Sequence, residues 1–178
     1  MIEKTRHEIP PDHPIRGFFQ RLTQRGLGQL NLHDADTIQY ITNLLTEFIQ
    51  IENMYRLQDE SGRRVRYVFE MLSRASNEMS PSLRLDCHRH VGDLVLFNLG
   101  LFPENLTYGH HTVSPDYYAR TGRRSYTIAA EMDSSPRGTI VYRKLSEQFE
   151  QCVVGLNWVK VYINDPFYQY MFREFDVT

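Results

Sequence analysis

Hydrophobic residues recur at spacings of three and four along most of the chain, which is the period of an amphipathic α-helix. The pattern is most regular in two segments. We predict one long helix from Asp34 or Asp36 to about Leu57, and another from Pro136 to about Ile163. Their apolar stripes are Ile38, Ile41, Leu44, Leu45, Phe48, Ile51 and Tyr55 in the first, and Val141, Leu145, Phe149, Cys152, Leu156, Val159 and Ile163 in the second.

Three serine-proline pairs predict helix starts, because serine is a good N-cap and proline suits the first helical position. They are Ser80-Pro81, Ser114-Pro115 and Ser135-Pro136. The helix that follows the first pair, 81–101, is apolar on every side in its second half, which is typical of a buried helix. We therefore predict that 81–101 is the central helix of the fold.

The rest of the chain completes an all-α prediction. A short helix is expected over 15–30, ending at Gly26 and Gly28, another over 63–76, and a short aromatic one over 167–175. No alternating pattern typical of strands is present. We predict a single bundle-like helical domain, 15–178, with about five main helices and short helices at both ends, preceded by an N-terminal arm, 1–14.

Composition narrows the classes of function. The chain has 178 residues, 24% of them charged, and a net charge of −2, so neither nucleic acid nor an anionic membrane is an expected partner. The longest apolar run, 94–102, is too short to span a bilayer. Cys87 and Cys152 fall inside predicted helices, and no leader-like segment opens the chain, so we expect reduced thiols and a cytoplasmic location.

Ionisable residues interrupt the apolar pattern at two places. Asp86, His90 and Asp93 are spaced four and three apart, so they share one side of the central helix, and Glu52 falls within the apolar stripe of 34–57. Carboxylates and a histidine facing inward from two helices predict a metal site, with a transition metal as a possible cofactor. The alternative is a buried ion-pair network in which an arginine (89, 123 or 124) satisfies Asp93 and a tyrosine satisfies Glu52. His88, His110 and His111 form a looser group with His90.

The helix predicted after Ser114 is rich in tyrosine and has Gly122 inside it. Glycine within a helix usually permits the close approach of a neighbour, and tyrosines beside such a notch are typical of a ligand pocket. The candidates for a pocket near 81–101 are Asp93, Tyr118, Arg123 and Tyr126. Helix packing explains the same tyrosines equally well.

Four segments carry a resemblance to a known group of proteins: ITNLLTEF (41–48), GDLVLFNLGLFPE (92–104), SPDYY (114–118) and GRRSY (122–126). They resemble a group of bacterial helical proteins that is known mainly as hypothetical proteins. The resemblance implies a bacterial, cytoplasmic, all-helical protein. It implies no activity and no catalytic residue.

Two hypotheses of function follow. The first is a non-enzymatic protein that binds a small molecule or a protein partner near the central helix. It would form a homodimer through the C-terminal third, where Val154, Trp158, Val161 and Tyr162 make a second apolar stripe. The second is a metal- or haem-dependent oxidoreductase built on Glu52, Asp86, His90 and Asp93.

Overall fold

A computed structural model describes residues 9–59, 61–77, 80–106 and 114–166 of the chain. These residues form α-helices and one short 3-10 helix, and they contain no strand beyond an isolated bridge between Gln58 and Arg64. The all-α prediction is confirmed. The elements are α1 (Pro14–Gly28), α2 (Ala35–Phe48), α3 (Ile51–Met54), α4 (Val68–Ser76), α5 (Pro81–Leu101), η1 (Pro103–Asn105), α6 (Pro115–Met132), α7 (Pro136–Glu147) and α8 (Phe149–Asn164).

The three serine-proline pairs do start helices. Ser80, Ser114 and Ser135 are the N-caps of α5, α6 and α7, and each hydroxyl accepts a hydrogen bond from a backbone N–H in the first turn. Asp34 caps α2 in the same way, with its carboxylate 2.9 Å from the backbone nitrogen of Thr37. The predicted central helix matches α5 at both ends.

Both long helices were predicted wrongly, because each is broken. The first ends at Phe48, and the next helix, α3, has four residues. The Asn53 side chain donates to the Glu47 carbonyl at 3.0 Å, which satisfies a backbone acceptor at the end of α2. The second breaks at Gln148, whose φ of −110° and ψ of 23° are not helical.

The helix predicted over 63–76 begins later, at Val68. The residues before it pair with the preceding segment instead. The Val65 amide donates to the Leu57 carbonyl at 2.7 Å, and the Asp59 amide donates to the Arg63 carbonyl at 2.8 Å. The turn between them contains Gly62 with a φ of 79°, a conformation that glycine adopts without strain. A turn and a short extended pair therefore replace the first part of the predicted helix.

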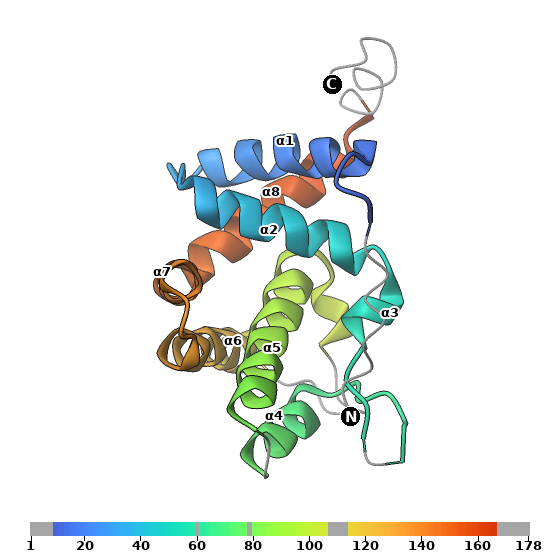
Figure 1. Cartoon of the computed structure of the whole chain (residues 1–178). Helices are drawn as coiled ribbons and strands as arrows, with labels where there is room; N and C mark the ends of the chain where they lie inside the picture. Colours follow the sequence, from blue (N-terminus) through green and yellow to red (C-terminus); the bar gives the residue numbers. More distant parts are fainter. Residues whose placement is uncertain (1–8, 60, 78–79, 107–113, 167–178) are drawn as a thin grey trace.

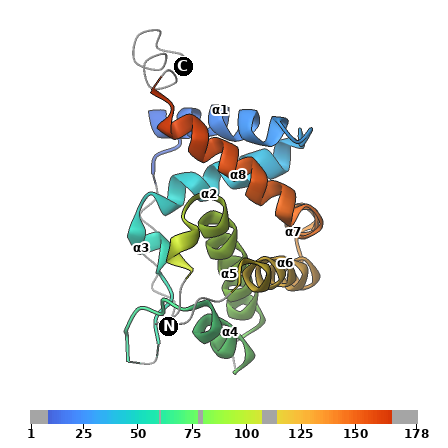
Figure 2. The ribbon, with the colours of Figure 1, turned by 180° about the vertical axis from the view of Figure 1, so that it is seen from behind.

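Helix α5 runs through the centre of the molecule and packs against α4, α6 and α8 (Figure 1). Helices α1 and α8 cross each other at one end of the molecule, on the far side from α4 (Figure 2). A Cβ atom on Gly26 would lie 2.5 Å from the Gly155 carbonyl oxygen, so the two backbones touch at a pair of glycines. The helix predicted over 167–175 and most of the predicted arm, 1–8, lie outside the described residues.

Candidate functional site

Helix α5 carries polar side chains on two sides, and these sides have different neighbours. Asp86, His90 and Asp93 form hydrogen bonds with residues of α2, α3 and α6, and with Arg56, which lies just after α3. Arg84 and His88 line a pocket between α4, α5 and α6. We call the first set, with its partners, the inner polar network: Tyr40, Arg56, Asp86, Arg89, His90, Asp93 and Tyr126. We call the second the α4–α5–α6 pocket.

Asp86 forms a bidentate ion pair with Arg56. The two guanidinium nitrogens Nη1 and Nη2 each lie 2.8 Å from one carboxylate oxygen, and Arg89 also donates to Asp86 from one turn along α5. Burial by itself would raise the pKa of Asp86. The hydrogen bonds and charge of Arg56, together with the charge of Arg89, outweigh burial and hold that pKa at about 2.

His90 is fully buried and uses both of its ring nitrogens. Nε2 lies 2.9 Å from the Met54 carbonyl oxygen, and Nδ1 accepts a hydrogen bond from Arg56 Nε at 3.3 Å. This arrangement fits a neutral ring with its proton on Nε2. Burial, with the adjacent charge of Arg56, lowers the pKa of His90 to about 3. The lone pair that a metal would need is therefore already engaged by Arg56.

Asp93 accepts hydrogen bonds from two tyrosines on other helices. Tyr40 Oη of α2 and Tyr126 Oη of α6 lie 2.6 and 2.8 Å from the same carboxylate oxygen. Two tyrosines from other helices, and not the expected arginine, thus hydrogen-bond Asp93. Burial raises the pKa of Asp93, against the charge of Arg89 and the two tyrosine hydroxyls. A Cβ atom on Gly92 would lie 2.8 Å from the Tyr126 ring, so the glycine gives that ring room to reach Asp93.

The structure does not assemble the predicted metal site. Glu52 is exposed on α3, because the break after α2 turns it out of the apolar stripe. Asp86 and His90 are engaged by Arg56, and Asp93 by tyrosines. Among the described residues, no group of three or more histidine, cysteine, aspartate or glutamate side chains is placed to hold a metal ion. The ion-pair alternative is also wrong for its two carboxylates, because tyrosines hydrogen-bond Asp93 and Glu52 is exposed. An ion pair does form at Asp86, with Arg56, which the sequence did not indicate. His110 and His111 lie outside the described residues.

The four predicted pocket residues do not line one pocket. Asp93 and Tyr126 are hydrogen-bonded to each other inside the inner polar network. Tyr118 is buried, and Arg123 is exposed, with its Nη1 3.3 Å from Glu150 of α8. The notch at Gly122 is filled, because a Cβ atom there would lie 2.5 Å from the ring of Phe149.

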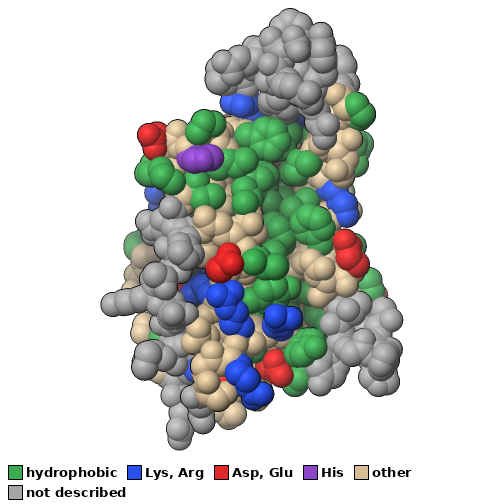
Figure 3. All heavy atoms as spheres, turned by 90° about the vertical axis from the view of Figure 1, so that its right-hand side faces the viewer, with side chains coloured by type: hydrophobic (Ala, Val, Ile, Leu, Met, Phe, Trp, Pro, Cys, Tyr) green, Lys and Arg blue, Asp and Glu red, His purple; other side chains and the backbone are tan. Residues whose placement is uncertain are grey.

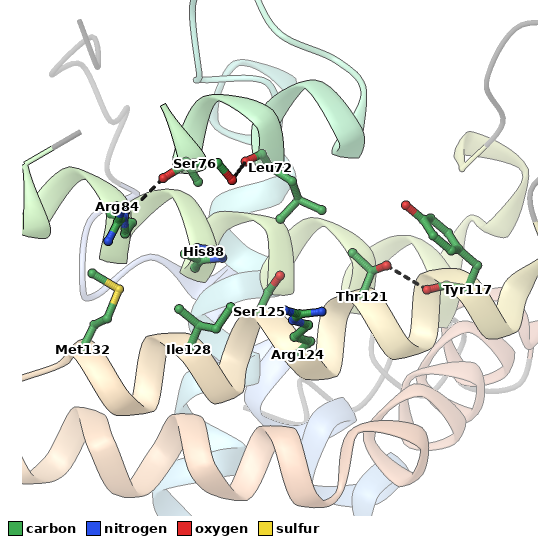
Figure 4. A pocket seen from close by; sticks show the side chains of 11 residues that line it. Leu72, Ser76, Arg84, His88, Tyr117, Thr121, Arg124, Ser125, Ile128 and Met132 are labelled. Atoms are coloured by element: carbon green, nitrogen blue, oxygen red, sulfur yellow. Dashed lines mark hydrogen bonds between the residues drawn. The ribbon is translucent and has the colours of Figure 1, made fainter. Parts of the chain in front are cut away.

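The α4–α5–α6 pocket is a partly open cavity of about 710 Å³ (Figure 4). Such a volume is within the range of small-molecule sites. Three elements line it: Leu72, Ala75 and Ser76 from α4, Arg84 and His88 from α5, and Tyr117, Thr121, Arg124, Ser125, Ile128 and Met132 from α6. The lining thus combines an apolar part with hydroxyl groups and three nitrogen-bearing side chains.

Positive charge dominates the ionisable groups of the pocket. Arg84 donates from Nε to the Ala75 carbonyl at 3.2 Å, which leaves its terminal nitrogens without a hydrogen bond among the described residues. Arg124 is exposed and has no hydrogen bond or ion pair within the described parts of the chain. No aspartate or glutamate occurs among the described lining residues. Two guanidinium groups therefore have no carboxylate partner there.

His88 lies between these arginines, on the side of α5 that faces α6 (Figure 4). Its Nδ1 atom is buried and has no hydrogen-bond partner in the described structure. Burial lowers the pKa of His88, and the charges of Arg84 and Arg124 lower it further. Buried polar atoms in proteins nearly always have partners, so an unpaired one beside a cavity is consistent with a ligand site.

Sequence reasoning missed this pocket, although two spacings indicate it. Arg84 and His88 are four residues apart and therefore share one side of α5. On α6, Tyr117, Thr121, Arg124 and Ile128 follow at steps of four, three and four. His88 belonged to a loose histidine group, and Arg124 was considered as a partner of Asp93. What the sequence lacked was the position of α4, which closes the third wall.

Exposed apolar residues gather on another face (Figure 3). On α8, Val154, Trp158 and Val161 are 45, 40 and 52% exposed, whereas Tyr162 is buried. A shallower cavity of about 610 Å³ lies beside Val161, between α8, η1 and the end of α5. The homodimer through the C-terminal third stays a prediction. Within the described ranges, no helix has both the length and the apolar character needed to cross a membrane.

Comparisons of the chain with protein-family models, with curated proteins and with solved structures find no match.

Proposed function

We propose that this protein binds a small molecule that has an anionic head group and an apolar body, and that the α4–α5–α6 pocket is its binding site. The observation that carries the proposal is the pair Arg84 and Arg124. Both guanidinium groups border a cavity of about 710 Å³ whose described lining contains no carboxylate. Arginine binds carboxylate, sulfate and phosphate groups through two parallel hydrogen bonds, which suits it to this role.

The remaining lining residues suit an apolar body. Leu72, Ile128 and Met132 supply aliphatic surface, and Tyr117 supplies an aromatic ring with a polar tip. Pockets that bind small molecules typically combine apolar walls with a few polar groups that fix orientation. Among the described lining residues no hydroxyl is hydrogen-bonded to Nδ1 of His88, and we therefore propose binding without chemistry.

The redox state of the thiols supports a reducing compartment, and we include a cytoplasmic, bacterial location in the proposal. Cys87 and Cys152 are both free and buried. Burial raises the pKa of Cys87 to about 11 and that of Cys152 to about 12, so both stay protonated thiols at neutral pH. Buried free thiols are usual in proteins of a reducing compartment.

Naphthalenesulfonate tests the proposal, because it joins a permanent anion to an apolar ring system. We expect it to bind the wild-type protein in calorimetric titration more tightly than the uncharged naphthalenemethanol does. Arg124→Gln should weaken sulfonate binding about tenfold, since a hydrogen bond to a charged group contributes about 1.5–3 kcal/mol.

Arg123→Gln is the matched control. Arg123 is the neighbouring residue on α6 and carries the same charge, but it pairs with Glu150 and does not line the pocket. Its replacement should change the affinity by less than about twofold, because exposed ion pairs contribute little. Equal weakening by both variants would show only a general effect of charge. No binding, or equal binding of the alcohol, would overturn the proposal.

A further inference from the structure

Besides the two arginines, the same pocket contains a third nitrogen-bearing side chain on which the proposed function does not depend. His88 lies on α5 one turn after Arg84, and it lines the pocket together with Arg124 of α6 (Figure 4). Its Nδ1 atom is buried without a partner, whereas both nitrogens of the nearby His90 are engaged. Two histidines two residues apart on one helix thus have opposite environments.

We propose that the head group bound in this pocket is a tetrahedral oxyanion, such as a phosphate, sulfate or sulfonate group, and that it is taken up together with one proton on His88. This inference rests on the proposed function, and it adds the class of head group and the pH dependence of binding. Three donors, Arg84, His88 and Arg124, then match the oxygens of a tetrahedral group. A carboxylate can also accept three hydrogen bonds, as Asp86 does, but its acceptor directions lie close to one plane. The oxygens of a tetrahedral group point in three directions, which suits donors that come from different helices better.

The charges around His88 explain why binding of the anion is coupled to protonation of the His88 ring. From α5 the charged neighbour is Arg84, from α6 it is Arg124 with Tyr117 nearby, and the described lining residues of α4 contribute no titratable group. Burial and the two arginines lower the pKa of His88, so the empty pocket favours a neutral ring. A bound anion offsets the arginine charges and accepts a hydrogen bond from the protonated ring. Both effects raise the pKa of His88.

The direction of the pH effect follows from this shift. The pKa of His88 lies below its ordinary value in the empty pocket and rises when the anion binds, so binding takes up a proton between these two values. Affinity therefore increases as the pH falls through the pKa of the complex. It levels off once the pH is below the pKa of the empty pocket. The sulfonate group stays fully charged throughout, so any pH effect belongs to the protein.

Calorimetric titration of naphthalenesulfonate at about pH 6.5, the ordinary pKa of histidine, measures the proton directly. Repeating it in buffers with different ionisation enthalpies gives the number of protons taken up. We expect a substantial fraction of one proton for the wild type and none for His88→Asn. His33→Asn, which replaces an exposed histidine outside the pocket, should keep the wild-type uptake.

The head-group class is tested by comparing naphthalenesulfonate with naphthalenecarboxylate, which carries one negative charge on the same ring system. The wild type should prefer the sulfonate about tenfold, since His88 adds one charged hydrogen bond. In His88→Leu the preference should disappear. If either variant fails to fold, the pKa of His88 in the wild type, followed by NMR with and without sulfonate, decides the matter.

The outcomes separate the two proposals. Sulfonate binding without proton uptake, with no rise in the pKa of His88, or with equal affinity for the carboxylate, overturns the inference and leaves the anion site standing. Proton uptake that persists in His88→Asn assigns the proton to another group and also overturns the inference. No sulfonate binding by the wild type overturns both.

Discussion

The two polar sides of α5 use similar residues for opposite purposes. On the side of the inner polar network, Asp86 is paired with Arg56, His90 uses both ring nitrogens, and Asp93 accepts from two tyrosines. On the side of the α4–α5–α6 pocket, Arg84 and His88 keep donors or acceptors without a partner among the described residues. In the inner polar network only Arg89 Nε is buried without a partner among the described residues, so the two sides differ mainly in how many of their polar groups are already paired.

This difference separates structural groups from groups available to a ligand. A buried polar group that already has its hydrogen bonds gains little from a further partner and loses much if it is disturbed. A group that lacks a partner lowers the stability of the folded protein until a ligand supplies one. Replacements on the two sides should therefore differ both in their effect on unfolding and in their effect on binding.

The largest effect on stability is expected at Asp86. Asp86→Ala leaves Arg56, whose side chain is 12% exposed, without its carboxylate, and it removes the partner of Arg89 as well. We expect the free energy of unfolding in urea to fall by about 3 kcal/mol, the lower end for a broken buried pair because Asp86 is partly open to solvent.

Glu150→Ala is the control, because it breaks the exposed pair with Arg123. It should cost less than about 1 kcal/mol. If Asp86→Ala cost no more than this control, the inner polar network would not be a structural element.

Within the first pH unit below about 6.5, acid is expected to cost less stability than Asp86→Ala, and the loss accumulates as the pH falls further. His90 has a pKa of about 3 in the folded protein, compared with an ordinary value of 6.5. Between these two pH values, His90 binds a proton in the unfolded chain but not in the folded protein. Stability is therefore retained above about pH 6.5 and falls as the pH drops towards 3, by up to about 1.4 kcal/mol per pH unit. The lowered pKa of Asp86 extends the loss below its ordinary 3.8, whereas the raised pKa of Asp93 opposes the loss.

Urea unfolding at a series of pH values measures this dependence. His90→Asn should be less stable than the wild type at neutral pH and should show a flatter decline between about pH 6 and 4. The comparison of the two curves isolates His90, because the other titrating groups are common to both proteins. Parallel curves would mean that the environment of His90 does not control the acid response.

The smallest loss of stability, or a gain, is expected at the pocket. His88→Leu removes a buried nitrogen that has no partner and replaces it with an apolar side chain. We expect the free energy of unfolding to change by less than about 0.5 kcal/mol or to rise by about 1 kcal/mol, while binding of naphthalenesulfonate weakens. Thermal unfolding and calorimetry of the same sample give both values. A large loss of stability would assign His88 to the structural side of α5.

The starts of α5, α6 and α7 were predictable from the sequence because their capping chemistry is local. A serine side chain caps the helix that its own proline begins, so α5, α6 and α7 begin where expected. The helix breaks were not predictable, since neither Ile49-Gln50 nor Gln148 contains glycine or proline, and the apolar stripes continue across both breaks. Local chemistry therefore set the beginnings, and tertiary packing set the interruptions.

The candidate site shows the same difference between features that depend on neighbouring residues, which were predictable, and features that depend on distant residues, which were not. The spacing of Asp86, His90 and Asp93 correctly placed them on one side of α5. Their partners Tyr40, Arg56 and Tyr126 are between 30 and 53 residues distant in the chain. Which distant residue reaches which group depends on the arrangement of the helices, and spacing within a helix carries no information about it. The pocket was missed for this reason, because its walls come from three helices.

The contact between Gly26 of α1 and Gly155 of α8 has a consequence for the protein during its synthesis. Helix α1 leaves the ribosome before α8, and the helix on which its glycine packs is completed about 130 residues later, which takes roughly 6–26 s at common rates of translation. During that interval Leu22 and Leu27, both buried in the finished fold, lack the α8 surface. The apolar side of α1 therefore lacks part of its cover, and is available to a chaperone, until α8 has emerged.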